Sequence, residues 1–444
     1  NPSSGRCVSR YVNGSSLDID YASEIALRTL NSGSWSDLSR DKKSLLLMNV
    51  ANKIEERKEE LSKVESLETG KSLSDAKNDI KNGIRYWRYA SSIVRVEYGN
   101  FINNIGSNKG AYTIYEPVGV VALILPWNFP FIVMSERLPF MLAAGCTVVA
   151  KPSEYASGSC LILGEILHEA GIPAGVYNVV TGNGSTVGKY LVENNNISMV
   201  SFTGSTENGK SIMKAASKNL KRVSLELGGK SPIIVFSDCD LDKAADAVIN
   251  GFTDNAGQCC IATSRLLVDD AIYGKLKEKI IRKLNEIDFQ QSLATDDQFN
   301  KVKSYIDRAK KISDLDMIGG ETDPNRLFVS PTVVEYHDTD YEIYKEEIFG
   351  PVLAVKVFKT EEEAIQLANN TEYGLAASIW TSNIAKANRI VRKIKAGRFW
   401  INSKQVNFPE LPVGGMGISG IGREAGLQGI LAYTEIKSVI YNEQ

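Results

Sequence analysis

The amino-terminal part of the chain shows the periodicity of amphipathic helices. Three helices are predicted there, over residues 21–30, 41–64 and 72–94. In the second, apolar residues recur three and four positions apart, at Leu47, Val50, Ala51 and Ile54. Its other faces carry Lys, Glu and Arg, which is typical of a helix with one buried face and a solvated remainder.

From residue 118 onward, short apolar runs of strand length alternate with helical patterns. Strands are predicted at 118–125, 146–150, 176–181 and 199–203 and around Glu226, with helices at 136–144 and 158–170. This alternation indicates a doubly wound α/β unit built on a parallel sheet. Ligands of such units bind outside the carboxyl ends of the strands, which is where the polar and Gly-rich stretches of this region lie.

A second alternating region begins with the apolar run 233–236 and continues towards residue 412. We expect it to form a second α/β domain. The last apolar stretch, 431–441, resembles a strand but is too short to form a core of its own. We therefore expect it to pair elsewhere, for example on another subunit.

Composition narrows the class of protein. A chain of 444 residues is too long for one core, so two or three domains are expected. The net charge of -2 gives no sign of a nucleic-acid partner, and no apolar run is long enough to cross a membrane. The six cysteines lack the spacing of a disulfide framework, which favours a reducing, cytoplasmic location.

Two adjacent cysteines, Cys259 and Cys260, follow a Gly-Gln pair that favours a turn. Zinc sites need spaced thiols, and neighbouring cysteines seldom converge to form a disulfide. A nucleophile is one interpretation, and a pair of small buried side chains is the other. The chain has only two histidines, His168 and His337, so neither a Ser-His-Asp triad nor a histidine metal site is supported, and no metal is expected.

Two further residues are candidates for acid–base chemistry and for stabilising an oxyanion. Glu226 stands in an otherwise apolar strand before a Gly-Gly pair, and apolar surroundings raise the pKa of a carboxyl group, which suits a general base. A Glu at a solvent-facing strand edge is the alternative. Asn128, between Trp127 and Phe129, is either a turn residue or an amide donor to a developing oxyanion.

Phosphate-binding signals lie at three predicted strand ends. Gly182, Gly184 and Gly188 nearly match the dinucleotide fingerprint but have one residue too many. The stretch 202–206 joins a strand to a helix through Gly204 and Ser205, which suits a pyrophosphate. Lys151 and Glu154 can hold a ribose, and the carboxylate would repel a 2′-phosphate; solvated loop charges are the alternative interpretation.

Taken together, these stretches resemble the aldehyde dehydrogenase superfamily over essentially the whole chain. The motifs occur in the family's order at 126–130 (PWNFP), 151–154 (KPSE), 202–205 (FTGS), 226–230 (ELGGK), 257–260 (GQCC), 347–351 (EIFGP) and 412–415 (PVGG). The resemblance implies a doubly wound dinucleotide-binding domain, an α/β catalytic domain and a small β extension for assembly into a dimer or tetramer. The expected residue ranges are 1–98 with 118–229, 230–412, and 99–117 with 428–444 respectively.

The resemblance also implies roles for individual residues. Cys260 would be the nucleophile, Glu226 the general base, and Asn128 with the Cys260 backbone N–H the oxyanion hole. The implied cofactor is NAD, in preference to NADP. The residues that would bind it are Pro126, Trp127, Lys151, Ser153, Glu154, Gly204, Ser205, Gly228, Glu347 and Phe349. The product would be a carboxylic acid, because relatives that transfer the acyl group to coenzyme A generally lack this Glu.

The substrate pocket implied by the resemblance contains Phe129, Glu136, Cys259, Ile261 and Asn407. Glu136 occupies a position where relatives acting on carboxylated semialdehydes often carry Arg. We therefore expect a cationic aldehyde of the betaine or amino type, although Arg137 could neutralise Glu136 and Asn407 replaces an aromatic residue. Succinate semialdehyde or another small aldehyde, an acyl phosphate or acyl-CoA reductase, and a catalytically silent relative are the alternatives.

Overall fold

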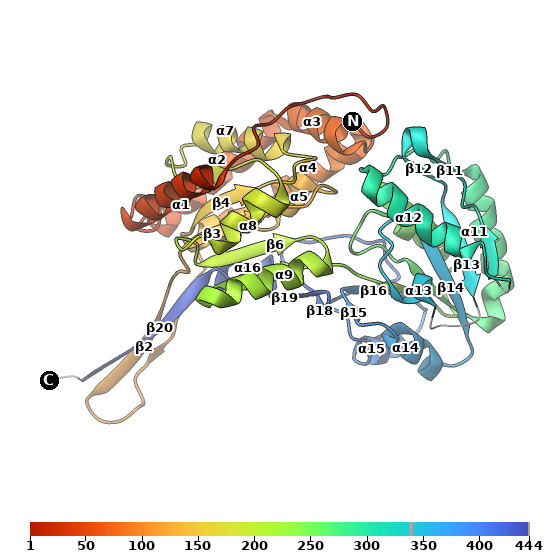
Figure 1. The fold of residues 1–444 in the computed structure, drawn as a ribbon. Helices are drawn as coiled ribbons and strands as arrows, with labels where there is room; N and C mark the ends of the chain where they lie inside the picture. The colour runs from red at the N-terminus through yellow and green to blue at the C-terminus, as the bar shows by residue number, and fades with distance from the viewer. Residues whose placement is uncertain (97, 314, 337–340, 443–444) are drawn as a thin grey trace.

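The computed structural model describes residues 1–96, 98–313, 315–336 and 341–442. His337 and residues 443 and 444, the end of the predicted range 428–444, lie outside these ranges. Two large sheets, each flanked by helices, form the body of the molecule, and a slender three-stranded sheet projects from it (Figure 1).

The amino-terminal region forms four helices: α1 (Ser16–Asn31), α2 (Arg40–Glu56), α3 (Lys58–Thr69) and α4 (Leu73–Ile93). The prediction of one helix over 41–64 was wrong, because Arg57 leaves the helical conformation at φ -98° and ψ 15°. Its side chain instead forms ion pairs with Glu60, Glu165 and Glu169. The apolar periodicity continues on both sides of this break, so the pattern alone does not reveal it.

The first large sheet has the order β19-β7-β6-β3-β4-β5. Its strands are β3 (Val120–Ile124), β4 (Thr147–Lys151), β5 (Tyr177–Val179), β6 (Met199–Thr203), β7 (Arg222–Glu226) and β19 (Gly420–Ile421). All neighbours pair in parallel except β19, which lies antiparallel to β7. Within β3, Val121 and Leu123 belong to one apolar core and Ala122 to the other, as expected for a strand covered on both faces.

Helices cover both faces of this sheet: α5 (Pro130–Ser135), α6 (Leu138–Ala144), α7 (Gly158–Glu169), α8 (Lys189–Glu193), α9 (Thr206–Ala216) and α16 (Gly426–Leu431) (Figure 1). The helix predicted at 136–144 is displaced. Glu136 caps the end of α5, which begins at Pro130, and Pro139 lies in the first turn of α6. A proline is well tolerated at a helix start, so it marks a second helix here.

The second large sheet has the order β10-β13-β14-β9-β8-β16-β17. Its strands are β8 (Pro232–Val235), β9 (Arg265–Asp269), β10 (Leu315–Ile318), β13 (Thr332–Tyr336), β14 (Val352–Phe358), β16 (Ala376–Trp380) and β17 (Arg398–Ile401). The main helices around it are α10 (Leu241–Thr253), α11 (Tyr273–Glu286), α12 (Asp296–Ala309), α14 (Glu361–Asn369) and α15 (Ile384–Val391). The loop carrying Cys260 leads into the amino end of β9.

The projecting sheet consists of β1 (Phe101–Ile102), β2 (Lys109–Pro117) and β20 (Thr434–Asn442). The strand-like tail therefore pairs within its own chain, from Lys109 opposite Asn442 to Pro117 opposite Thr434. We call β1, β2 and β20 the arm. It extends away from the body, and the carboxyl terminus lies at its far end (Figure 1). The domain boundaries given above remain a prediction.

Candidate active site

The turn before the two cysteines has an uncommon backbone. Asn255, Ala256 and Gly257 have φ values of 49°, 54° and 70°, so three consecutive residues are left-handed. At Gly257 a side chain would also collide with the chain, because its Cβ would lie 2.2 Å from the Gly350 carbonyl oxygen. The buried Gln258 side chain holds the turn, donating from Nε2 to the Asn255 carbonyl at 3.0 Å and accepting from the Ala294 N–H at 2.8 Å.

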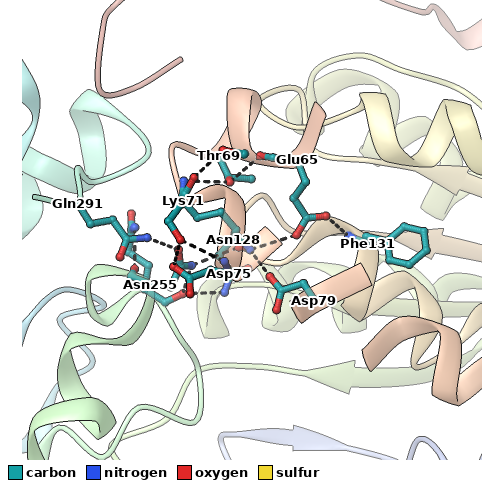
Figure 2. Close-up of polar contacts among 12 residues, drawn as sticks. Glu65, Thr69, Lys71, Asp75, Asp79, Asn128, Phe131, Asn255 and Gln291 are labelled. Atoms are coloured by element: carbon teal, nitrogen blue, oxygen red, sulfur yellow. Dashed lines mark hydrogen bonds and ion pairs between the residues drawn. The ribbon is translucent and has the colours of Figure 1, made fainter. Parts of the chain in front are cut away.

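Asn128 is joined directly to this turn. Its Nδ2 donates to the Gln258 carbonyl oxygen at 2.9 Å, and Asn255 Nδ2 donates to the Asn128 carbonyl at 3.2 Å (Figure 2). Because an amide nitrogen carries two hydrogens, one remains on Asn128 for an oxyanion. Asn255 and Gln258 are functional supports that sequence reasoning missed; the hydrogen-bonding side chains on both sides of a glycine were the available signal.

A buried charge cluster lies behind the Asn128 loop. Lys71 Nζ contacts Glu65 Oε1 at 3.1 Å and Asp79 Oδ2 at 2.6 Å, and it lies 4.2 Å from the centre of the Phe129 ring (Figure 2). Glu65 Oε2 accepts a hydrogen bond from the Phe131 N–H at 3.3 Å. Burial would lower the pKa of Lys71, but the two carboxylates outweigh it and raise the pKa, so this lysine stays charged. The sequence analysis missed this support of the loop.

Glu226 ends β7 with its carboxyl group buried and, among the described residues, with no hydrogen-bond partner for Oε1. Burial raises its pKa to about 8; Arg137 opposes this shift and Glu424 reinforces it. Arg137 Nε lies 3.8 Å from Glu424 Oε1, and that carboxylate accepts hydrogen bonds from Ser224 and Tyr433. The alternative of a solvent-facing Glu is wrong, because this carboxyl group is enclosed.

The Gly-Gly pair after Glu226 packs against the nucleophile loop. A Cβ on Gly229 would lie 2.4 Å from the Cys260 carbonyl oxygen, so only glycine allows this approach. Cys259 and Cys260 are both half-buried free thiols. The neighbouring Cys260 side chain, burial and Asp254 together raise the pKa of the Cys259 thiol. The loop that carries Cys260 therefore contacts both the Asn128 loop and the glycine pair that follows Glu226.

One end of the predicted dinucleotide groove lies at the carboxyl end of β4. Lys151 Nζ contacts Glu154 Oε2 at 3.0 Å, and the Gly184 N–H approaches Glu154 Oε1 at 3.5 Å. Burial acts to raise the pKa of Glu154, but backbone N–H groups and Lys151 lower it overall, so it is ionised. Ser153 is buried beside them, and its Oγ accepts from the Tyr155 N–H.

Ser205 caps the amino end of α9, its Oγ accepting from the Asn208 N–H at 3.3 Å. Gly204 donates its N–H to the Glu226 carbonyl, so the loop predicted to bind phosphate is hydrogen-bonded to the end of β7. Ser205 and Glu347 line one cavity of about 660 Å³ together with Lys301. Lys301, on α12, was missed because nothing in its local sequence sets it apart.

The other end of the groove joins Glu347 to the Gly228-Gly229 turn. Glu347 Oε1 accepts from the Gly229 N–H at 3.0 Å, and a Cβ on Gly228 would lie 2.3 Å from Glu347 Oε2. Phe349 is left-handed, with φ 60°, and its ring meets Trp127 edge-on at 5.6 Å. Pro126 precedes Trp127 in the loop after β3. The glycine cradle and the carboxylate fit a bound dinucleotide between the two sheets.

The predicted substrate residues lie on several elements. Glu136 accepts a hydrogen bond from the Tyr86 hydroxyl at 3.0 Å and lies 3.8 Å from Arg137, so its carboxylate is already paired. Asn407 accepts from Arg398 through its side chain and from Arg85 through its carbonyl. Of the remaining three, Cys259 and Ile261 are the sequence neighbours of Cys260, and Phe129 follows Asn128.

No group of three or more His, Cys, Asp or Glu side chains in the described ranges is arranged to hold a metal ion. No helix in the same ranges is long and apolar enough to cross a membrane.

Comparison with known proteins identifies the family. A model described as the aldehyde dehydrogenase family matches residues 1–439. The chain belongs to this family. It is 38% identical over 466 residues to peroxisomal aminoaldehyde dehydrogenase 1 of Pisum sativum, covering 99% of this chain and 91% of the plant protein. The resemblance inferred from the motifs is thereby confirmed, and the protein is an oxidoreductase.

Solved structures of aldehyde dehydrogenases confirm the fold. The chain matches an NAD-dependent aldehyde dehydrogenase from Sinorhizobium meliloti with a TM-score of 0.95 and 43% identity, covering 97% of this chain and 88% of that one. It matches betaine aldehyde dehydrogenase from Staphylococcus aureus in complex with NAD+ with a TM-score of 0.97 and 36% identity, covering 100% and 91%.

The left-handed turn leads to a first prediction. Gly257→Ala should strain the backbone by about 1–2 kcal/mol and force Gly350 aside, displacing Cys260 and lowering turnover about tenfold or more. Gly274→Ala, where a Cβ meets nothing within 4 Å, is the matched control. Thermal unfolding and the rate of NADH formation would be measured for both variants. Equal behaviour of the two would contradict the role of the turn.

Proposed function

We propose that this aldehyde dehydrogenase oxidises a small aldehyde to a carboxylic acid with NAD, using Cys260, Asn128 and Glu226. The proposal is supported by the contacts of the Cys260 turn with the Asn128 loop and with Gly229, three residues after the buried Glu226. The acyl phosphate or acyl-CoA reductase and the silent relative are disfavoured because all three residues are present.

In the first step the Cys260 thiolate attacks the aldehyde carbon, forming a C–S bond and an oxyanion. The Asn128 side-chain amide and the Cys260 backbone N–H stabilise that oxyanion. Their placement is supported by the hydrogen bond from Asn128 to the Gln258 carbonyl, two residues before Cys260. The surrounding network of Asn255, Gln258 and Lys71 keeps these donors in position before substrate arrives.

The chemistry that bound NAD supplies is acceptance of a hydride, which leaves an acyl group on Cys260. Lys151 and Glu154 would hold the adenosine ribose, Ser205 the pyrophosphate, and Glu347 the nicotinamide ribose. The ionised Glu154 favours a free 2′-hydroxyl over a 2′-phosphate, so NAD is preferred over NADP. The Staphylococcus aureus relative was crystallised with NAD+.

Release of the product requires a general base. Glu226 removes a proton from water, the hydroxide attacks the thioester carbon, and the Cys260 thiolate leaves. The buried carboxyl group, with its pKa of about 8, is basic enough for this step at mildly alkaline pH.

A cationic aldehyde is the proposed substrate class. The Pisum sativum and Staphylococcus aureus relatives are named for aminoaldehydes and betaine aldehyde. The prediction that Glu136 contacts the substrate stands, although Tyr86 and Arg137 share its charge. Succinate semialdehyde is the alternative, supported by Arg85 and Arg398, which both contact Asn407.

The arm is proposed to join subunits into a dimer or tetramer. β20 is the outer strand of its sheet and has one unpaired edge, and Ile436 and Ile440 on it are exposed by 55% and 72%. Edges and apolar side chains of this kind are normally covered. A cytoplasmic location is proposed from the six free thiols.

Turnover of aldehydes tests the proposed function. The purified protein should reduce NAD with at least one aldehyde from a panel of 4-aminobutyraldehyde, betaine aldehyde, succinate semialdehyde, glycolaldehyde and pentanal. Cys260→Ala should abolish NADH formation while NAD binding, followed by protein fluorescence, persists. If no aldehyde is oxidised although NAD binds, the proposal of a catalytically active enzyme fails.

Glu226 leads to a prediction about pH. Because the base works only when deprotonated, steady-state turnover should rise with pH and level off above about 8. Glu226→Gln should remove this dependence and slow hydrolysis about 100-fold or more, while a single burst of NADH still forms. Rapid-mixing measurements of the burst separate the two steps. Loss of the burst itself would show that Glu226 acts before hydrolysis.

The arm leads to a prediction about assembly. Ile440→Asp should shift the protein towards smaller species in light-scattering measurements, because a charge replaces an apolar side chain exposed on the edge strand. Ile384→Asp, the same change at an exposed position on α15, should leave the mass unchanged. A monomeric wild-type protein would rule out the assembly role.

A further inference from the structure

A polar cavity of about 390 Å³ lies against the nucleophile loop. Asp254, six residues before Cys260, and Thr263, three residues after it, both line the cavity. Gln405 also lines it and donates from Nε2 to the carbonyl of Ile261, the residue that follows Cys260, at 3.2 Å. Asn78, from α4, contributes a further part of the wall. The cavity is therefore bounded by the chain on both sides of the nucleophile.

Asp254 supplies a negative charge to this cavity. Asp254 is exposed to solvent, with part of its surface covered by the protein around the cavity. No lysine, arginine or histidine forms an ion pair with it anywhere in the ranges that the structure describes. Burial, Asp79 and Asp75 raise its pKa to about 6, against the influence of Lys71, so the group is still largely ionised at neutral pH.

The neighbouring charges leave Asp254 without compensation. The ammonium group of Lys71 is held between Glu65 and Asp79. Lys404 also lines the cavity, but it is exposed and forms no ion pair with Asp254 among the described residues. Glu136, by contrast, has Tyr86 and Arg137 as partners and a side chain that is only 13% exposed. Of these two carboxylates, Asp254 is the one left free to pair with a ligand.

The cavity wall also discriminates between kinds of cation. Apart from the charged Asp254 and Lys404, its polar members are amides and hydroxyls: Asn78, Asn250, Thr253, Thr263, Ser378, Ser403 and Gln405. None of the described residues that line it is aromatic. A quaternary ammonium group donates no hydrogen bond and is usually held by aromatic rings, whereas a primary ammonium group donates three. This wall suits the primary ammonium group.

We propose that Asp254 binds the charged end of an ω-aminoaldehyde in this cavity, with the aldehyde group directed towards Cys260. The inference rests on the proposed aldehyde oxidation and narrows its substrate class from cationic aldehydes to primary aminoaldehydes. Asp254 acts as a specificity residue: it attracts and orients the substrate and takes no part in bond making.

The test compares 4-aminobutyraldehyde with pentanal, an uncharged aldehyde of equal length, and with betaine aldehyde, a shorter quaternary cation. Wild-type protein should show a higher kcat/KM for 4-aminobutyraldehyde than for pentanal or betaine aldehyde. Asp254→Asn should lower kcat/KM for 4-aminobutyraldehyde about fivefold, through KM, because the ion pair with the substrate ammonium group is lost. The kcat at saturation and all constants for pentanal should stay within about twofold, since the reacting groups are untouched. Asp254→Glu should restore much of the preference.

Matched variants make each outcome decisive. Glu136→Gln should affect 4-aminobutyraldehyde less than Asp254→Asn, and Asp270→Asn, on the 3-10 turn before α11, should have no effect. Equal losses for pentanal and the amine in Asp254→Asn would overturn the inference in favour of a structural role. A wild-type preference for pentanal, betaine aldehyde or succinate semialdehyde would overturn it and leave aldehyde oxidation standing. Failure to oxidise any aldehyde would overturn both.

Discussion

The carbonyl oxygen of Gln258 is the point on which the catalytic arrangement depends. It accepts hydrogen bonds from Asn128, after a strand of the first sheet, and from Asn255, before a strand of the second. Through the bond from Asn128, this backbone atom joins loops of the two sheets that are 130 residues apart in the sequence. Its position requires the left-handed turn, since an ordinary helical ending of α10 would direct the chain elsewhere.

Burial of charge is the second constraint around this site. Glu226, Arg137 and Glu424 lie together beneath the substrate region, and Lys71 lies between Glu65 and Asp79 beneath the Asn128 loop. Neighbouring charges decide whether each buried group stays ionised. Lys71 stays protonated between two carboxylates, whereas the pKa of Glu226 is raised to about 8 in the same low-dielectric interior. Replacing one member of such a pair would leave the other charge buried without a partner, which lowers the free energy of unfolding by about 3–5 kcal/mol.

Local pattern predicted the strands of the first sheet well, because each is a short apolar run that ends at a Gly-rich or polar loop. The pattern did not reveal the helix break at Arg57, because the apolar periodicity continues from α2 into α3. It also did not reveal that a proline starts a second helix at α6. It placed Glu154 beside Lys151 correctly, since both follow one strand. Lys71 supports the Asn128 loop from a segment distant in sequence, and Lys301 lines the cavity from α12, so no spacing could reveal either residue. The partner of the tail strand was equally hidden.

The carboxyl-terminal residues have a consequence for how the chain folds during synthesis. β19 forms the outer edge of the first sheet beside β7, Tyr433 is fully buried in its core, and β20 pairs along the whole of β2. The amino-terminal half therefore leaves the ribosome without its last strand, a core side chain and the partner of its arm. Contacts of such long sequence separation form slowly, and the exposed edge is open to aggregation until translation ends. Molecular chaperones would be most useful to this protein in that interval.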